Sequence, residues 1–526
     1  MNDSMNRRTF LNVMGKGMAA LTLPLISCGS RSGNSQSAEK PNIVFIFIDD
    51  LGWKDLGVYG SEMYETPNID QLAKEGMRFT DAYAAAAVCS PTRASLYTGK
   101  YPATVKITDY LPGRTSRDFE PLRAPEDLDH LPHDEITLAE VLRDNGYNTH
   151  FIGKWHLGGE GSLPTDHGFM TNVAGCHMGN PGRDGFFSPY NIPNLEPREE
   201  NEYLTERLTD DALSVLENAG DDPFFLMMSY YTVHRPLQAP EDRISEYESK
   251  MEDQEYTNPE FVVEQNPDMP SYDETSWEEK QEWAEQESLF EQDGFNDLRL
   301  TRVKRRQNHP VFGAMVDYLD FSVGRILDKL ESLNLEENTI VIFYSDNGGL
   351  ASYYPGAATS EAPLRAGKGW LYEGGIRVPL IVRWPGEIPA NTVNGSLISS
   401  PDFYPTLLEM TGIESESSQE IEGMSFWSAL RDQEELTDRT LYWHWPHYSN
   451  HGQQSPGGAI REGEYKLIEY YENNTRQLFN LREDMEEMND LAEQEPETAE
   501  RLTKKLHEWR ERIDAQMPVP NPDYTG

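Results

Sequence analysis

The chain has 526 residues, of which 37% are apolar and 11% aromatic, enough for a large folded core spread over more than one domain. Its 90 acidic and 45 basic residues give a net charge of −45, which repels nucleic-acid phosphates, so nucleic-acid binding is not expected. Three cysteines are too few for a disulfide scaffold, and without a run of about 20 apolar residues no transmembrane helix is predicted.

Residues 1–27 have the pattern of a signal peptide, with a charged start and a short apolar stretch over 18–26. The adjacent Arg7 and Arg8 resemble the twin-arginine type, which implies the twin-arginine export machinery as a partner. Residues 25–28 resemble a lipobox, which implies a lipid anchor at Cys28, although an ordinary cleaved signal with an incidental cysteine also fits. Residues 28–40 form a Ser/Gly/Asn-rich tether. We therefore expect export from a bacterial cytoplasm, to the periplasm or, through the anchor, to the cell surface.

Buried strands alternate with amphipathic helices through residues 41–424, the predicted large domain. Continuous apolar runs at 42–48, 149–152, 224–229 and 339–344 are typical of strands covered on both faces of a parallel sheet. Helical patterns begin at Pro67, with Asn68 as a possible N-cap, and cover 136–145 and 315–333. This alternation predicts an α/β fold with a mostly parallel central sheet flanked by helices.

Two later segments differ from this pattern. Residues 241–308 are predicted to be an acidic insertion, because 241–300 holds 20 acidic and only 4 basic residues. Both a solvated flap and a lid that helps to set specificity fit this composition. Residues 425–526 are expected to form a smaller α+β domain, with antiparallel strands over 441–445, 458–468 and 476–481 and a helix over 497–514.

Polar side chains follow two of the buried strands directly. Asp49 and Asp50 come after the first strand, and Asp346 and Asn347 after the strand at 339–344. Ligand sites of parallel sheets lie beyond the carboxyl ends of the strands, where such residues meet. An all-oxygen set of this kind suits Ca²⁺ or Mg²⁺ rather than zinc, so the sequence predicts a metal site.

The strongest motif runs from Cys89 to Gly99 and reads Cys-Ser-Pro-Thr-Arg-Ala-Ser-Leu-Tyr-Thr-Gly. Together with the paired aspartates it resembles the signature of the formylglycine-dependent sulfatases, of the alkaline-phosphatase-like superfamily. Further matching segments lie at 153–158, 372–379 and 477–481. The resemblance implies hydrolysis of sulfate esters, a maturation enzyme that oxidises Cys89 to formylglycine, and one Ca²⁺ ion held by Asp49, Asp50, Cys89, Asp346 and Asn347.

The chemistry of sulfate transfer explains why the family replaces a thiol. A sulfur adduct of sulfate would be hard to release, whereas a hydrated aldehyde carries two hydroxyls on one carbon. One hydroxyl attacks sulfur and displaces the alcohol; the other then loses a proton, the C=O bond reforms and sulfate leaves.

The resemblance also implies roles for five more residues. Arg93 steadies the nucleophile, and it lies one turn beyond Cys89 if a helix begins there. Lys154 and Lys368 bind sulfate, His156 is the base, and His234 is the general acid to the leaving oxygen. Lys154 and His156 alternate, so in an extended segment they would face the same side.

For four residues the sequence fits a place in the substrate pocket and a purely structural role equally well: His177, His309, Arg365 and Arg377. The aromatic segment 443–447 is either a sugar platform or core packing, and Cys176 is expected to be an inert thiol.

The substrate expected from the resemblance is a sulfated carbohydrate, such as an oligosaccharide derived from algal or other polysaccharides. Protein and substrate are both anionic, so a local basic cleft must attract the ester, and high salt would screen the repulsion. Two alternatives remain: a phosphate or phosphonate ester hydrolase of the same superfamily, and a non-catalytic glycan-binding lipoprotein.

Overall fold

The structure, a computed structural model, describes residues 40–525 except 270–271, 273–275, 285, 287–289, 291–298, 353–355 and 415–418. The predicted signal peptide, the lipid anchor at Cys28 and the tether up to residue 39 lie outside the described residues. Among the helices that are described, none is both long enough and apolar enough to span a bilayer.

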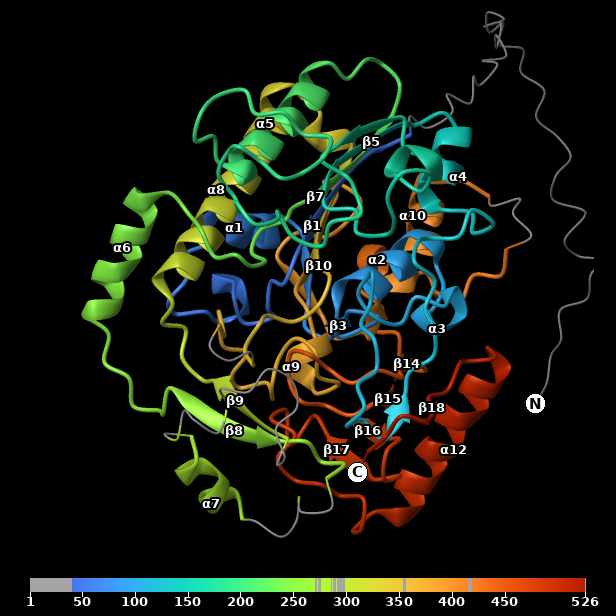
Figure 1. The fold of residues 1–526 in the computed structure, drawn as a ribbon. Coiled ribbons are helices and arrows are strands. Elements are labelled where there is room, and N and C mark those ends of the chain that lie inside the picture. The colour runs from blue at the N-terminus through green and yellow to red at the C-terminus, as the bar shows by residue number, and fades with distance from the viewer. Residues whose placement is uncertain are drawn as a thin grey trace, which may run out of the picture. The chain divides into compact units, whose positions relative to one another are not determined.

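A large sheet of eight strands forms the centre of the fold (Figure 1). Five neighbouring strands of this sheet, β10, β1, β7, β5 and β6, run parallel to one another. Strand β11 is antiparallel to β10, and β2 is antiparallel to β11. The predicted α/β fold with a mostly parallel sheet is therefore confirmed. In spatial order the strands are β12 (Thr392–Asn394), β2 (Met77–Phe79), β11 (Leu380–Arg383), β10 (Thr339–Ser345), β1 (Asn42–Ile48), β7 (Phe224–Ser229), β5 (Asn148–Gly153) and β6 (Thr171–Val173).

The position of β1 at the centre of the sheet explains why its sequence is apolar throughout. Val44, Ile46 and Ile48 belong to one buried cluster, and the alternate residues of the strand belong to another. The first cluster is closed by α1 (Pro67–Glu75), α5 (Leu204–Glu217) and α8 (Pro310–Ser332). The second is closed by α2 (Cys89–Thr98), α4 (Leu138–Asp144) and α10 (Phe403–Thr411). A strand with helices on both faces has no solvated side, so it needs no polar alternation.

The start of α1 differs from the prediction. Pro67 occupies the first turn, where its missing N–H costs nothing, and Thr66 is the N-cap residue. Asn68, predicted as the cap, lies inside the helix and its side chain donates a hydrogen bond of 2.7 Å to Asp320 of α8. The prediction for Asn68 was wrong because the helix begins one residue earlier, and Asp320 accepts hydrogen bonds from the backbone N–H groups of Asn68 and Ile69 in its first turn.

A second, four-stranded antiparallel sheet forms near the C-terminus, in the order β14 (Thr440–Trp445), β15 (Gly457–Glu462), β16 (Tyr465–Tyr470) and β17 (Arg476–Asn480). One face packs against α12 (Pro496–Arg512), and the other buries Trp443 against residues of the larger part of the fold. The single strand predicted over 458–468 was wrong, because Gly463, with φ of 58°, turns the chain between β15 and β16.

The acidic insertion contains α6 (Glu241–Glu252), α7 (Trp277–Glu282) and a pair of antiparallel strands, β8 (Phe261–Gln265) and β9 (Leu300–Lys304). Helix α6 packs against α8, and Glu264 of β8 is only 2% exposed. The interpretation as a solvated flap is therefore wrong for this hairpin. Shorter elements are α3 (Pro102–Val105), α9 (Glu373–Ile376) and α11 (Trp427–Asp432), and the strand pairs β3 (Ala82–Tyr83) with β13 (Ile398–Ser399) and β4 (Leu122–Arg123) with β18 (Val519–Pro520).

Candidate active site

Four neighbouring parallel strands end at the same edge of the large sheet, and each is followed by a predicted site residue. Asp346 and Asn347 follow β10, Asp49 and Asp50 follow β1, and Lys154 follows β5. The loop after β7 carries His234. The strand order thus brings together side chains that are distant in the sequence.

Two close groups of potential ligand atoms occur at this edge. Carboxylate oxygens of Asp49 and Asp346 and the Cys89 sulfur lie within 4.8 Å of one another, as do carboxylate oxygens of Asp49 and Asp50 and a ring nitrogen of His234. Burial and the neighbouring carboxylates raise the pKa of Asp49 well above its usual value, although Lys154 opposes them. Carboxylates crowded together in this way are stabilised by a cation placed between them.

Three basic side chains balance the three carboxylates. Lys154 Nζ lies 2.8 Å from both oxygens of Asp49, and Lys368 Nζ lies 2.5 Å from Asp50 Oδ1. Burial acts to raise the pKa of Asp50, but Lys368 and His234 lower it far below its usual range. The third cation is Arg93, so the six formal charges cancel.

Arg93 is completely buried and joins three strand ends. Its Nε and Nη2 donate to Asp346 Oδ2 at 3.0 and 2.7 Å, and its Nη1 donates to the Lys154 carbonyl and to Ser229 Oγ, both at 2.8 Å. Helix α2 begins at Cys89, so Arg93 lies one turn further along the same helix. Because all three guanidinium nitrogens donate hydrogen bonds to these strand ends, Arg93 holds the loops in a single geometry.

Cys89 contacts an oriented imidazole. Its Sγ lies 3.3 Å from Nδ1 of His156, whose Nε2 lies 2.5 Å from the carbonyl oxygen of Leu111. A carbonyl only accepts, so Nε2 carries the proton and the lone pair of Nδ1 faces position 89. Burial lowers the pKa of His156 well below its usual value, which keeps the ring neutral, and burial raises the pKa of the Cys89 thiol.

The prediction that His156 lies in an extended segment was wrong. Strand β5 ends at Gly153, and His156 has a left-handed backbone with φ of 58°. That conformation is uncommon for a residue other than glycine, and here it aims the ring at α2. The shared side expected for Lys154 and His156 is therefore wrong: Lys154 points to Asp49 and His156 to Cys89.

His234 is also oriented by a carbonyl. Its Nδ1 donates to the Arg235 carbonyl oxygen at 2.7 Å, which leaves Nε2 directed at the site, 3.6 Å from Asp50 Oδ2. Burial lowers the pKa of His234 to about 3, with Asp50 opposing. A negative charge brought in by a substrate acts in the same direction as Asp50 and favours the protonated ring.

A cavity of about 710 Å³ opens over these groups. Five of the predicted site residues line it: Asp50, Cys89, His156, His234 and Lys368. The others, Asp49, Arg93, Lys154, Asp346 and Asn347, lie buried behind them. The wall also includes residues that the sequence analysis did not select, among them Tyr110, Asn180, Arg235, Asn450 and His451. Arg235 directly follows His234 and could have been noticed; the loop that carries Asn450 belongs to the C-terminal segment and has no recognisable motif.

The donor set fits a hard divalent cation. Asp49, Asp50, Asp346 and Asn347 offer only oxygens, and Asn347 Oδ1 is buried without a hydrogen-bond donor among the described residues. Its amide nitrogen instead donates to Asp50 Oδ1 at 2.8 Å, which turns the oxygen away from that carboxylate. Since the fixed charges cancel, an added dication leaves the site positive, as the binding of an anionic ester requires.

The residues left open by the sequence fall into two groups. His177 lines the cavity. His309 caps α8, Arg377 pairs with Asp81 at 2.8 Å, and Arg365 pairs with Glu264 at 2.8 Å, so these three are structural rather than pocket residues. Cys176 is buried in the core cluster beside β7.

The aromatic segment 443–447 is core packing and not a sugar platform. Trp443 is buried and donates to the Ala84 carbonyl at 2.8 Å. His444 is buried between Tyr471 and the Gln516 carbonyl, at 2.9 Å from each.

His447 predicts a pH dependence of stability. Its Nε2 lies 2.7 Å from Thr108 Oγ1 and 3.4 Å from Asp127 Oδ2. Burial acts to lower the pKa of His447, but Asp109 and Asp127 outweigh it and raise the pKa. A raised histidine pKa stabilises the fold below the unfolded-state pKa of about 6.5, and this stabilisation is lost as pH rises through the folded-state value. We expect His447→Gln to lower the free energy of unfolding by about 1–3 kcal/mol near pH 5 and by less near pH 9.

Urea unfolding of both proteins across this pH range measures the difference. A deficit that stays constant, or grows, as pH rises would contradict the assignment of a charged His447.

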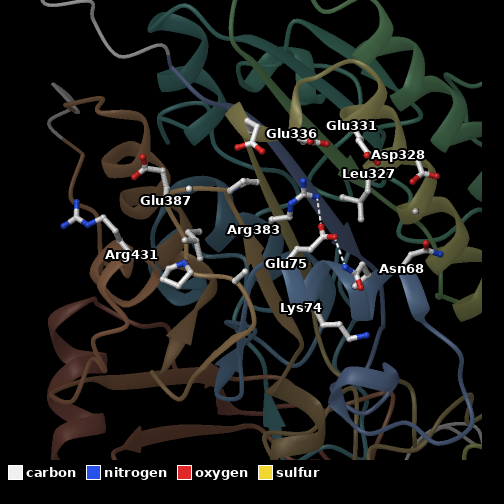
Figure 2. Close-up of a pocket in the computed structure, with 18 residues that line it drawn as sticks. Asn68, Lys74, Glu75, Leu327, Asp328, Glu331, Glu336, Arg383, Glu387 and Arg431 are labelled. Atoms are coloured by element: carbon white, nitrogen blue, oxygen red, sulfur yellow. Dashed lines mark hydrogen bonds and ion pairs between the residues drawn. The ribbon is translucent and has the colours of Figure 1, made fainter.

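A second cavity, of about 1020 Å³, lies at the opposite edge of the sheet (Figure 2). Arg383, at the end of β11, pairs in register with Val341 near the start of β10, and Glu75 lies 3.3 Å from Arg383. The cavity is therefore at the amino ends of the parallel strands, away from the predicted site. The charged residues of its wall are mainly acidic, with Glu75, Asp328, Glu331, Glu336, Glu337 and Glu387 against Lys74, Arg383 and Arg431, so the cavity is less suited to an anionic substrate.

Comparison with known proteins agrees with this geometry. A family model described as Sulfatase matches residues 41–413, and one described as N-sulphoglucosamine sulphohydrolase, C-terminal, matches residues 366–516. A sulfatase of Formosa agariphila is 29% identical, covering 93% of this chain and 92% of its own. The N-acetylgalactosamine-6-sulfatase of Sus scrofa is 31% identical, covering 80% of this chain and 72% of its own. The crystal structure of Ps i-CgsB in complex with k-i-k-neocarrahexaose has a TM-score of 0.68 and 26% identity, covering 91% of this chain and 94% of that one.

Fold and site together define an enzyme with an α/β fold that hydrolyses anionic esters, with its polar groups at the carboxyl ends of parallel strands. The chain belongs to the sulfatase family and is a sulfuric ester hydrolase. The resemblance found in the sequence is confirmed, and the non-catalytic alternative is set aside.

Proposed function

We propose that this sulfatase removes sulfate from a saccharide, with formylglycine made from Cys89 as nucleophile and one Ca²⁺ ion held by Asp49, Asp50, Asp346, Asn347 and the side chain at position 89. The observation that carries the proposal is the contact of Cys89 with the lone pair of His156 Nδ1 at a cavity wall, with Asp50 in the same wall and Asp49 and Asp346 buried behind it. The raised pKa of Cys89 supports it too, since a buried neutral thiol is a poor nucleophile.

When present, the aldehyde hydrate supplies the attacking oxygen and the dication supplies fixed positive charge at the sulfate. The chain's own residues do the rest. Lys368, at the cavity wall, binds the anionic group, and Lys154 is proposed to assist from behind Asp49. His156 accepts a proton at Nδ1 from the side chain at position 89, because its other nitrogen is held by Leu111.

His234 is proposed as the general acid. Its Nδ1 proton is committed to the Arg235 carbonyl, so protonation at Nε2 makes the imidazolium that can donate to a leaving oxygen. Burial lowers the pKa of His234, and the negative charge of a bound ester, like that of Asp50, raises it and so favours protonation at Nε2.

The saccharide class rests on the cavity and on the relatives. A cavity of about 710 Å³ is of the size that accommodates a small ligand such as a sugar unit. Relatives of this chain are named for N-acetylgalactosamine-6-sulfate, and a similar structure holds k-i-k-neocarrahexaose. We propose sulfated glycan fragments, including algal ones, as substrates of this chain.

The cellular setting is part of the proposal. The twin-arginine pattern carries folded proteins, so oxidation of Cys89 by a maturation enzyme could precede export to the periplasm. Cys28 would then anchor the enzyme to a membrane.

The test is an assay of aldehyde-bearing enzyme on a panel of defined sulfated saccharides, with para-nitrophenyl sulfate and para-nitrophenyl phosphate in parallel. We expect sulfate esters to be hydrolysed faster than the phosphate by at least about tenfold, a difference of about 1.4 kcal/mol in barrier. Faster phosphate hydrolysis would favour the phosphate or phosphonate alternative instead.

The role of His234 leads to a leaving-group prediction. We expect His234→Ala to lower kcat on a sugar sulfate by about 10²–10⁴-fold, and on para-nitrophenyl sulfate far less, because nitrophenolate leaves without a proton. Steady-state kinetics on both substrates measure the two ratios. Equal losses on both would remove the general-acid role.

A further inference from the structure

Residues 365–370, here called the Lys368 loop, carry the lysine that faces the cavity. Lys368 is anchored at two points: its N–H donates to the Gly349 carbonyl at 2.9 Å and its Nζ to Asp50 at 2.5 Å. Three residues earlier, Arg365 is 94% buried, at 6% exposure, and does not line the cavity. Its contacts nevertheless join three separate parts of the chain.

Each nitrogen of the Arg365 guanidinium has an acceptor. Nε and Nη2 donate to the two oxygens of Glu264, at 3.1 and 2.8 Å, in the paired geometry that arginine and carboxylate prefer. Nη2 also lies 3.2 Å from Tyr272 Oη, and Nη1 donates to the Glu487 carbonyl at 2.6 Å. The guanidinium carbon lies 4.1 Å from the centre of the Tyr372 ring.

The backbone of the Lys368 loop needs such support. Ala366 has a left-handed φ of 58°, which is unfavourable for alanine, whereas Gly369 adopts its φ of 83° without strain. The Arg365 carbonyl accepts from Gly374 N at 2.9 Å, and a Cβ added at Gly374 would lie 2.4 Å from that oxygen. The loop thus lies directly on the backbone of α9, and one of its residues, Ala366, has a conformation that it does not favour.

Two partners of Arg365, Glu264 and Tyr272, come from the acidic insertion. Glu264 lies in β8, and the neighbouring strand β9 hydrogen-bonds to the main part through Lys304 N and the Ala351 carbonyl, at 2.9 Å. Glu264 and Arg365 are 101 residues apart in the sequence. Removing two charges from water to form a buried ion pair costs free energy, so the pair adds little net stability. Loss of one partner strongly destabilises the protein, because the other charge is left buried alone, so the pair defines geometry more than it adds stability.

We propose that Glu264 and Arg365 are positioning residues, through which the acidic insertion holds the Lys368 loop in the conformation that presents Lys368 to the sulfate ester. This inference rests on the proposed role of Lys368. It gives the insertion a function in catalysis without contact with the substrate. The loop's strained alanine is the element that the ion pair holds in place.

The test is a double-mutant cycle on the full-length, aldehyde-bearing enzyme with para-nitrophenyl sulfate. Glu264→Gln keeps the shape of the side chain and removes its charge; Lys368→Met keeps most of the length and removes the amine. We expect Glu264→Gln to lower kcat by about 10–100-fold, the size of effect expected from a small misplacement, with bound calcium per chain unchanged. In the Lys368→Met background, the same change should lower kcat less than twofold, because the group being positioned is gone.

Two further variants separate positioning from folding. Ala366→Gly relieves the unfavourable φ and leaves the loop free to move, so we expect lower kcat with a thermal midpoint no lower than that of the parent. Glu472→Gln breaks the matched ion pair between Glu472 and Arg299, 2.8 Å apart and also linked to the insertion, and should leave kcat within twofold.

The outcomes are distinguishable. Equal losses from Glu264→Gln in both backgrounds, or full activity of Glu264→Gln, would overturn the positioning inference alone. An unchanged kcat in Lys368→Met would overturn the role of Lys368, and the inference with it. A loss in Glu472→Gln as large as that in Glu264→Gln would show a general effect of the insertion on folding and would also overturn the inference.

Discussion

Cys89→Ala is expected to lower turnover of any sulfate ester by on the order of 10⁵-fold or more, the scale seen when a covalent nucleophile is removed. The reason is that alanine carries no group that can be oxidised to an aldehyde, while His156 keeps its orientation through Leu111. The fold should persist, because the change removes one sulfur atom and costs about 1 kcal/mol. Single-turnover kinetics and thermal unfolding of the variant measure the two effects.

Cys176→Ala is the matched control. It removes the other described cysteine, which is buried like Cys89 and lies 3.9 Å from Tyr231 Oη, but it touches none of the proposed catalytic groups through its side chain. We expect wild-type turnover from it. Mass spectrometry of the active enzyme should show an aldehyde at position 89, and fully active protein with only a thiol there would refute the covalent mechanism.

Removal of the proposed Ca²⁺ ion should lower both turnover and stability. Treatment with a calcium chelator is expected to lower turnover by about 10³-fold, because fixed positive charge at the developing anion is lost, and added Ca²⁺ should restore it. It should also lower the free energy of unfolding, by about 4.1 kcal/mol relative to enzyme at a free Ca²⁺ concentration 1,000 times the Kd. Metal analysis and thermal unfolding of the same samples give both values.

Two variants test where the proposed ion binds. Asp50→Asn removes a carboxylate that lines the cavity, and we expect it to lose the bound calcium and the Ca²⁺-dependent shift in stability. Asp268→Asn changes a buried carboxylate away from the strand ends, hydrogen-bonded to the backbone N–H of Glu472 and Asn473, and should keep the metal. Calcium retained at full occupancy in Asp50→Asn would contradict the ligand set.

Local patterns were enough to find the strands and the groups that follow them. The apolar runs that became β1 and β10 needed helices on both faces, and such strands end at one edge of a parallel sheet. Asp49, Asp50, Asp346 and Asn347 could therefore be expected together before any coordinates. The start of α2 at Cys89 likewise agrees with the expected one-turn spacing to Arg93.

Orientation within the site was not contained in any local pattern. His156 was expected to face the same side as Lys154, but its left-handed backbone and the Leu111 carbonyl, 45 residues away, set its direction. Arg365 was left open between pocket and scaffold, and only its ion pair with Glu264 decided the question. Both cases depend on partners brought close by the fold, which spacing along the chain does not encode.

From the sequence alone, an α/β sheet, the sulfatase signature at Cys89 and a set of oxygen ligands could be predicted, because each of these follows from short-range periodicity or a contiguous motif. The tertiary structure alone decided which nitrogen of each histidine faces the site, which basic side chains lie in the wall and which behind it, and how the acidic insertion contacts Arg365, three residues before Lys368. Those features arise where segments distant in sequence pack together and exclude water. There the spatial contacts of a side chain, and not its neighbours in sequence, determine its orientation and protonation.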